Sequence, residues 1–212
     1  MATASQSLFN MTVSSDNAGG NQGLLMPKLQ FRFRVNFLNF GIDQVGGLNL
    51  TKQVIDCARP NLSFAEIPLQ VYNSTIKLAG KHTWADITVN VRDDASGTVS
   101  KAVGQQLQKQ LDFVEQASAA TGQDYKFQTN IEILDGGNGT AAPIVLETWE
   151  LYGCFLKTAN YNTLNYATSE AVTIGLTIAY DNAVQSPLTS GVGTSVGRIQ
   201  SGDSATGIGA VT

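Results

Sequence analysis

The stretch Leu62–Asp94, LSFAEIPLQVYNSTIKLAGKHTWADITVNVRDD, decides the fold class of this chain. Apolar side chains occupy every second position near its start and again near its end, at Ile67, Leu69, Val71, Ile87, Val89 and Val91. A period of two places each apolar set on one face of a β-sheet. Asn73-Ser74 and Ala79-Gly80 lie between the two sets and favour turns, and Gly80 is free to adopt a positive φ. The stretch therefore predicts two β-segments, a glycine turn and a third strand.

Pro68 lies in the middle of the first β-segment. Proline has no N–H to donate to a β-ladder and is confined to edge strands and bulges. We therefore expect this segment to project from the main sheet or to run along its edge.

The rest of the chain predicts more strands and one helix. Strands are expected at residues 28–37, 48–58, 125–134, 144–157 and 172–180. Apolar residues recur at helical spacing after Asp93-Asp94, at Val99, Val103, Leu107, Leu111 and Val114, and Gly122 is the expected stop. The predicted fold is mainly β, an antiparallel β-barrel or β-sandwich with one packed α-helix.

Composition divides the 212 residues into three segments. Residues 1–27 are rich in Ser, Asn and Gly and predict a flexible extension. Residues 28–182 carry the strands and the helix and predict one β-barrel domain. Residues 183–212 are rich in Gly, Ser and Thr and predict a C-terminal tail.

The charge content favours self-association over binding to nucleic acid or membrane. Charged residues make up 14% of the chain, against about 25% in typical soluble domains. So few charges do little to suppress association between copies. The net charge of −4 argues against affinity for a phosphate backbone, and no apolar run approaches the length of a membrane span.

The sequence offers no catalytic or metal-binding constellation. His82 is the single histidine, and Cys57 and Cys154 are the two cysteines. A zinc site needs three or four clustered ligands, so these residues fall short. Glu147 and Glu150 lie on opposite faces if residues 144–157 form a strand. We therefore expect no enzyme, no metal and no cofactor.

A series of short motifs resembles a known family. A cysteine-containing strand ends at a proline, and an Ile-Pro segment follows it. A basic residue with Ala-Gly comes next, and a Thr-aromatic-x-Asp run precedes a Thr-Val strand. In this chain the motifs are Cys57-Ala58-Arg59-Pro60, Ile67-Pro68, Lys77-Leu78-Ala79-Gly80, Thr83-Trp84-Ala85-Asp86 and Thr88-Val89. Over residues 28–182 their order and spacing resemble the inner tail-tube protein of contractile-tailed bacteriophages, and both ends lie outside the resemblance.

The resemblance implies a structural protein of the virion. Six copies would form a ring, and stacked rings would form the rigid inner tube through which DNA leaves the particle. Rings would stack through the loop that contains Arg59, Pro60, Glu66, Ile67 and Pro68. Expected partners are other copies of the chain, a sheath protein, a baseplate, a tail terminator and a tape-measure protein, with transient passage of DNA and no stable membrane association. The expected location is the phage tail, and the host cytoplasm during assembly.

Two other functions remain open from the sequence. The same tube could belong to a headless injection device, either a type VI secretion system or a tailocin. A monomeric carbohydrate-binding β-sandwich is the alternative from another class, and it would present an exposed aromatic platform.

Overall fold

The structure, a computed structural model, describes residues 27–42, 47, 50–137, 142–187 and 191–193. The chain divides into two compact units, residues 1–32 and 33–212. In the first unit the Arg32 N–H donates to the Leu29 carbonyl at 3.2 Å, and the Arg32 guanidinium lies 5.4 Å from the centre of the Phe31 ring. Residues 28–32 are therefore not part of a strand, and the expected strand at 28–37 is wrong in its first half.

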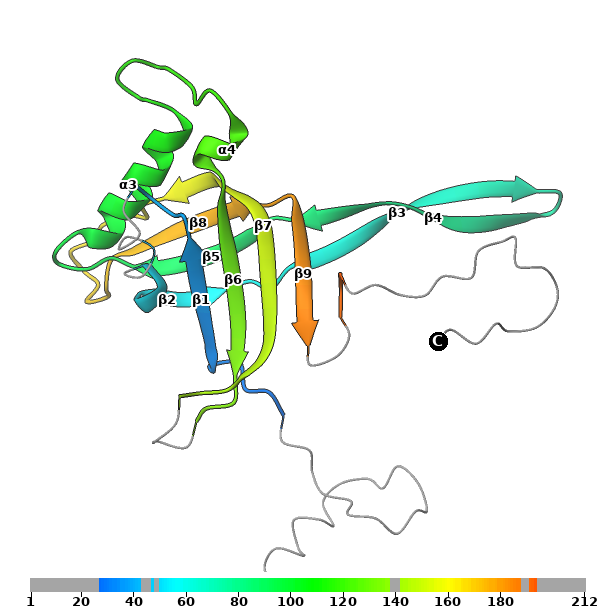
Figure 1. Ribbon diagram of the computed structural model, residues 1–212, viewed down its shortest axis with the longest axis horizontal. Coiled ribbons are helices and arrows are strands. Elements are labelled where there is room, and N and C mark those ends of the chain that lie inside the picture. The colour runs from blue at the N-terminus through cyan, green and yellow to red at the C-terminus, as the bar shows by residue number, and fades with distance from the viewer. Residues whose placement is uncertain (1–26, 43–46, 48–49, 138–141, 188–190, 194–212) are drawn as a thin grey trace, which may run out of the picture. The chain divides into compact units, whose positions relative to one another are not determined.

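In the second unit, four antiparallel strands form sheet A in the order β1–β6–β7–β9 (Figure 1). Their bounds are Phe33–Leu38, Phe127–Leu134, Val145–Asn160 and Asn182–Pro187. Sheet B begins at the C-terminal half of β7 and continues through β8 (Thr173–Ala179), β5 (Ile87–Arg92) and β2 (Val54–Cys57). The antiparallel β fold expected from the sequence is confirmed.

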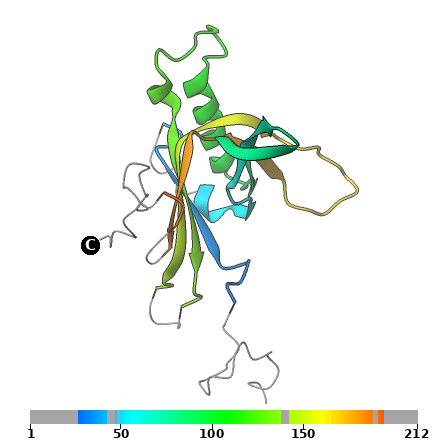
Figure 2. The ribbon, with the colours of Figure 1, turned by 90° about the vertical axis from the view of Figure 1, so that its right-hand side faces the viewer.

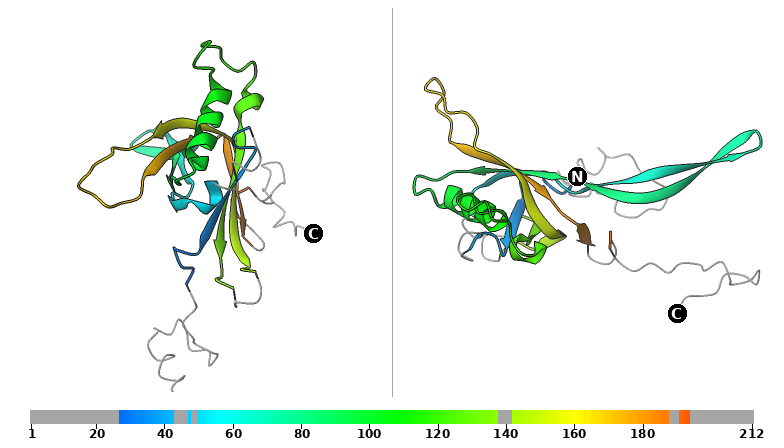
Figure 3. Two further views of the ribbon diagram at one scale, coloured as in Figure 1. Left: turned by 90° about the vertical axis from the view of Figure 1, so that its left-hand side faces the viewer. Right: turned by 90° about the horizontal axis from the view of Figure 1, so that it is seen from above.

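Strand β7 joins the two sheets because it is long and bends at Gly153. It pairs with β9 up to Tyr152, with β6 up to Cys154, and with β8 from Phe155 onward. Gly153 has a φ of +68°, and a Cβ atom there would lie 2.1 Å from the Asp181 carboxylate. Glycine is thus required at the bend, after which the strands of sheet B run across those of sheet A (Figures 1 and 3).

The core lies between the inner faces of the two sheets and is closed by helix α3, Thr98–Gln110. The helix contributes Val99, Ala102 and Val103, all of which are buried. Gln106 is also buried, and its side chain accepts from the Gly41 N–H and donates to the Tyr125 carbonyl. The helix is seen end-on against the sheets in the right-hand view of Figure 3.

Helix α3 is shorter than the apolar spacing predicts. It ends at Gln110, and Leu111 has extended backbone that forms a bridge with Ser118. Val114 is exposed instead of buried. Gly122 does not stop the helix but begins a second one, α4 (Gly122–Tyr125), which Thr121 and Asp124 start with a capping box. Tyr125 therefore belongs to α4, and β6 begins two residues later.

Strands β3 (Asn61–Val71) and β4 (Ser74–Ala85) form a separate two-stranded sheet, which extends as a hairpin arm in Figure 1. The prediction that the segment with Pro68 projects or lies at an edge is confirmed. The turn predicted at Asn73-Ser74 lies one residue earlier, at Tyr72-Asn73, whereas the turn predicted at Gly80 is wrong, because Gly80 lies inside β4. Gly80 and Lys81 oppose Ala65 in a β-bulge, where a Cβ on Gly80 would lie 3.0 Å from the Ala65 carbonyl oxygen.

Two further elements differ from the sequence predictions. Residues 50–52 have helical backbone, so the strand expected at 48–58 is reduced to β2. Strand β9 lies in the segment that the composition predicts as a tail, and Ala183 is buried in the core. The sheet thus continues to Pro187, while residues 194–212 lie outside the described residues.

Candidate functional site

The β3–β4 hairpin carries an apolar face that no other described strand covers. Ile67 pairs with Leu78 and Leu69 with Ile76, so their side chains lie side by side on this face. The face consists of Ile67, Leu69, Val71, Ile76 and Leu78, each with between 45% and 50% of its surface exposed. A two-stranded sheet is marginally stable alone and gains stability when such a face is covered.

The opposite face of the hairpin is polar. Glu66 and Lys77 form an ion pair at 2.6 Å, and the Thr75 hydroxyl donates to the Gln70 side chain at 2.9 Å. Both members of the ion pair are well exposed, so it adds little to stability. The alternation of the two strands therefore gives the hairpin one face for water and one for a partner.

A row of aromatic rings anchors the base of the hairpin to sheet B. Phe64 lies 6.4 Å from His82, His82 lies 6.4 Å from Trp84, and Trp84 lies 5.8 Å from Tyr180. Tyr180 belongs to the core, and Trp84 packs against it. In Figure 2 the hairpin points towards the viewer.

The structure separates the residues predicted for the stacking loop. Arg59 and Pro60 precede β3, whereas Glu66, Ile67 and Pro68 lie within the strand. Ile67 is on the apolar face, and Glu66 and Pro68 are on the polar face. The segment is thus an arm of paired strands instead of a loop.

The residues of the family-like motif hold this arm together. Lys77 pairs with Glu66, Ala79 and Gly80 lie at the bulge, and Trp84 belongs to the aromatic row. The other two motif residues, Thr83 and Asp86, are not part of the aromatic row and contact other residues. The Thr83 carbonyl accepts from Ser63, and the Asp86 carboxylate pairs with Lys157 at 2.5 Å.

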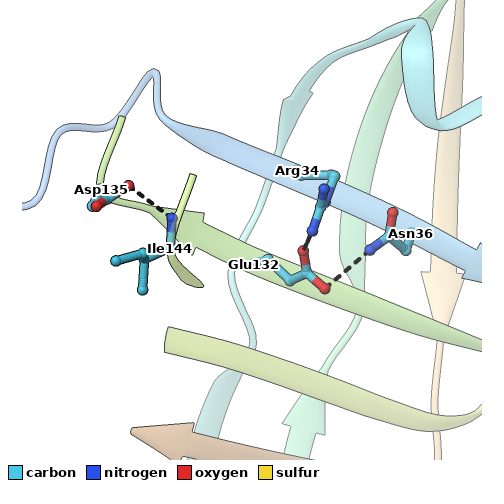
Figure 4. A network of polar contacts seen from close by, with 5 residues as sticks. All are labelled: Arg34, Asn36, Glu132, Asp135 and Ile144. Atoms are coloured by element: carbon cyan, nitrogen blue, oxygen red, sulfur yellow. Dashed lines mark hydrogen bonds and ion pairs between the residues drawn. The ribbon is translucent and has the colours of Figure 1, made fainter. Parts of the chain in front are cut away.

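Sheet A presents a polar outer face, which the sequence reasoning missed. Arg34 pairs with Glu132 at 2.5 Å, and the Asn36 amide donates to the same carboxylate at 3.0 Å (Figure 4). On the same face, Asn130 lies beside Asn36, and Glu150 lies beside Asn130 on the next strand. The Tyr152 hydroxyl donates to the Glu150 carboxylate. Alternation along the strands was the available signal, because most positions between the inward apolar residues are polar, as at Arg34 and Asn36.

The turn between β6 and β7 lies at one end of this face. The Asp135 carboxylate accepts from the Ile144 N–H at 2.9 Å and from the Gly137 N–H at 2.9 Å (Figure 4). These bonds to backbone close the turn.

Strand β1 leaves one edge of sheet A unpaired among the described residues. The other edge of sheet A is β9. One of its backbone N–H groups, that of Gln185, already donates to the Val192 carbonyl at 2.7 Å. Because sheet A has four alternating strands, β1 and β9 run in opposite directions. A β1 strand placed beside the β9 strand of an identical copy would therefore be antiparallel to it.

Both cysteine thiols have a raised pKa. Burial raises the pKa of the Cys57 thiol to about 12 and that of Cys154 to about 11, so both are protonated at neutral pH. Within the described part of the chain, no three His, Cys, Asp or Glu side chains are grouped closely enough to hold a metal ion. No helix among these residues is long and apolar enough to cross a membrane.

Comparison with solved structures gives matches along most of this chain. A chain of the sheath/tube terminator of the extracellular contractile injection system PVC matches with a TM-score of 0.57 and 13% identity, covering 77% of this chain and 99% of that chain. A chain of the PVC sheath–tube complex in the extended state matches with a TM-score of 0.55 and 13% identity, covering 76% of this chain and 93% of that chain. A chain of the tube-terminating cap of the anti-feeding prophage (AFP) matches with a TM-score of 0.54 and 14% identity, covering 84% of this chain and 99% of that chain.

This chain has the fold of contractile-injection tube proteins. The resemblance seen in the sequence motifs is thus confirmed at the level of fold. No family model matches the sequence, and no curated protein matches it.

Proposed function

We propose that this chain is a structural subunit that assembles with copies of itself into the rigid inner tube of a contractile phage tail. The observation that carries the proposal is the uncovered apolar face of the β3–β4 hairpin. The tube-protein fold supports it, because the matched chains belong to contractile injection systems. The role is structural and uses no catalytic residue.

Rings form by pairing of sheet edges in this proposal. The free edge of β1 adds to β9 of the next copy, and repetition around an axis closes sheet A into a barrel without open edges. About four new backbone hydrogen bonds, since Pro187 has no N–H and that of Gln185 is already used, contribute about 2–6 kcal/mol per contact. Association of two proteins costs about 4–15 kcal/mol, so one such contact holds two free copies weakly. In a complete ring, which we propose to contain six copies, every copy makes two such contacts, so the ring is more stable than a pair of copies.

Rings stack through the hairpin. Each of its five half-exposed apolar side chains gains about 1 kcal/mol when a second copy covers it. A single hairpin therefore contributes about as much as the cost of association. Six hairpins acting at once overcome that cost because the contacts after the first are intramolecular. Assembly then requires a preformed ring, such as one on a baseplate.

The polar outer face of sheet A lines the lumen in this arrangement. Among the described residues, the charged side chains on this face are two carboxylates, Glu132 and Glu150, and one guanidinium, Arg34. A surface with this excess of negative charge repels phosphate groups. DNA would pass without adhering, which is the property that a conduit for genome ejection needs.

The proposed partners follow from the same role. They are a sheath around the tube, a baseplate and a terminator at its two ends, and a tape-measure protein inside it. The solved structures that match include a sheath–tube complex, a terminating cap and a baseplate. We propose the phage tail as the location, and the host cytoplasm during assembly.

A tube of a headless injection device is the second candidate. The observation in its favour is that PVC and AFP, which supply the matches above, are named as an injection system and an anti-feeding prophage. Capsid and terminase genes beside the coding gene would favour the phage tail, and their absence from the locus would favour the injection device.

Size exclusion combined with negative-stain electron microscopy tests the proposal. The purified full chain should form rings at high concentration, and rings should extend into tubes when a baseplate or a ring seed is added. A chain that stays monomeric at every concentration, with and without the seed, contradicts the proposal.

A further inference from the structure

The loop between β7 and β8, residues 161–172, surrounds a hollow of about 480 Å³. Its wall is mixed and more polar than apolar, with Tyr161, Leu164 and Tyr166 among asparagine and threonine side chains. Glu170 is the one charged side chain of the lining. A hollow of this size and composition is suited to an uncharged aromatic guest with a polar tip.

Asparagine side chains hold the loop open. The Asn162 amide donates to the Thr173 carbonyl at 3.0 Å and to its hydroxyl at 2.8 Å. The side-chain oxygen of Asn160 accepts from the Asn162 N–H, and the side-chain oxygen of Asn165 accepts from the Ala167 N–H. The loop therefore has a defined shape before any guest arrives, which lowers the entropic cost of binding.

The loop also exposes apolar surface without a cover in the single chain. Leu164 is 78% exposed and the Tyr166 side chain is fully exposed. Neighbouring exposed groups of this kind mark interaction sites.

The tip of the hairpin presents a matching guest. Tyr72 is 100% exposed and has a φ of +44°, which is strained for a residue with a side chain. From Leu69 to Ile76 the tip carries no charged residue. Val71 pairs with Ser74, so the tight turn holds Tyr72 away from the strands.

We infer that the hollow of the 161–172 loop receives the Tyr72 ring of a second copy of this chain. This inference rests on the proposed tube function and assigns the receiving surface of the stacking contact. Tyr72 is fully exposed in its own chain, so the contact joins two copies. The Tyr72 hydroxyl donates to the Glu170 carboxylate of the receiving copy. Guest and hollow are different surfaces, so the contact is heterologous and repeats from ring to ring.

Disulfide trapping in assembled tubes tests the inference. The double variant Tyr72→Cys with Leu164→Cys is oxidised after assembly and separated on a denaturing gel. Every variant also carries Cys57→Ser, because Cys57 is only partly buried, whereas Cys154 is buried and is kept. Lys77→Cys with Leu164→Cys is the matched control, since Lys77 lies on the polar face behind the tip.

The inference predicts a ladder of cross-linked multimers from the double variant and no ladder from the control. A mixture of the two single-cysteine variants should stop at dimers, because each copy then has one reactive end. Tubes that form without a cross-link overturn the inference and leave the tube function standing. A cross-link within dilute monomers also overturns it, and absence of tubes from the wild-type chain overturns the tube function as well.

Single substitutions provide a second measurement if the double variant fails to assemble. Tyr72→Ala should raise the concentration needed for tube growth about 30-fold, as for loss of a buried aromatic anchor. Tyr72→Phe should cost less because it removes only the hydroxyl. Unchanged growth of the Tyr72→Ala variant contradicts the inference.

Discussion

At the scale of single residues, Gly153 decides whether the two sheets can share a strand. Its φ of +68° lies in the region that side chains disfavour, and the Asp181 carboxylate occupies the space of a Cβ atom. The same carboxylate pairs with Lys126 at 2.5 Å. Gly153 therefore allows β7 to bend between the two sheets and leaves room for the Asp181 carboxylate that pairs with Lys126.

We predict that Gly153→Ala lowers the free energy of unfolding by about 1–3 kcal/mol, the cost of a strained backbone position. Gly104→Ala is the matched control, because Gly104 lies within α3 and nothing lies within 4 Å of its added Cβ. The control should gain about 0.5–1 kcal/mol from helix propensity. Urea unfolding followed by circular dichroism measures both, and equal stability of the two variants would argue against the bend.

Gln106 is the second residue on which the fold depends. Its buried amide satisfies the Gly41 N–H and the Tyr125 carbonyl. Gln106→Leu leaves both backbone groups without this partner, at about 1–3 kcal/mol each. The exposed neighbour Gln108→Leu should change the free energy of unfolding by less than about 0.5 kcal/mol. Chemical denaturation distinguishes the two, and similar values for both would remove Gln106 from this role.

At the scale of elements, the start of α3 depends on the Asp94 carboxylate. It accepts hydrogen bonds from Ser96, from the Thr98 hydroxyl and from backbone N–H groups, which lower its pKa from 3.8 to about 2. A depressed pKa stabilises the fold above the unfolded value, and this contribution is lost as the pH falls towards 2. We predict a decline in melting temperature between pH 4 and pH 2 that is smaller in Asp94→Asn. An identical decline in the variant would contradict the assignment.

The hairpin gives the second prediction for an element. Leu69→Ser and Ile76→Ser change the exposed apolar face, so the folded monomer should keep its stability within about 1 kcal/mol while tube growth is lost. Gln70→Ser and Thr75→Ala change the polar face of the same strands and should leave growth intact. Sedimentation of assembled material measures growth. Normal growth of the apolar-face variants would exclude this face from stacking.

The alternating strands were the part of the fold that the sequence could predict. Strands β5 and β8 follow an uninterrupted period of two, and both lie where the pattern places them. The end of α3 could not be predicted, because Leu111 and Val114 keep the helical spacing while Leu111 bridges to Ser118. Gly80 was misassigned to a turn because a bulge and a turn both favour glycine.

The candidate site could be predicted only in part. Ile67 and Pro68 drew attention to the projecting segment, and a second β-segment was predicted after it, but Ile76 and Leu78 were not recognised as part of its apolar face. The polar face of sheet A depends on which strands are neighbours across long sequence separations, such as Arg34 beside Glu132. Such pairing is a tertiary property, so no local pattern contains it.

At the scale of the whole molecule, the described surfaces leave two features for other copies to complete. One is the unpaired edge of β1, and the other is the apolar face of the hairpin. Open sheet edges invite pairing, and a fold that retains one gains from closure into a ring. The proposed tube uses both features, with the polar face of sheet A towards the lumen.

Electron cryo-microscopy of the assembled chain tests this account most directly. The map should show β1 of each copy antiparallel to β9 of its neighbour, Arg34 and Glu132 on the lumen wall, and the apolar face of the hairpin covered by the adjoining ring. A tube whose sheets do not join at these edges, or a solitary molecule with the hairpin face still exposed, would contradict the account.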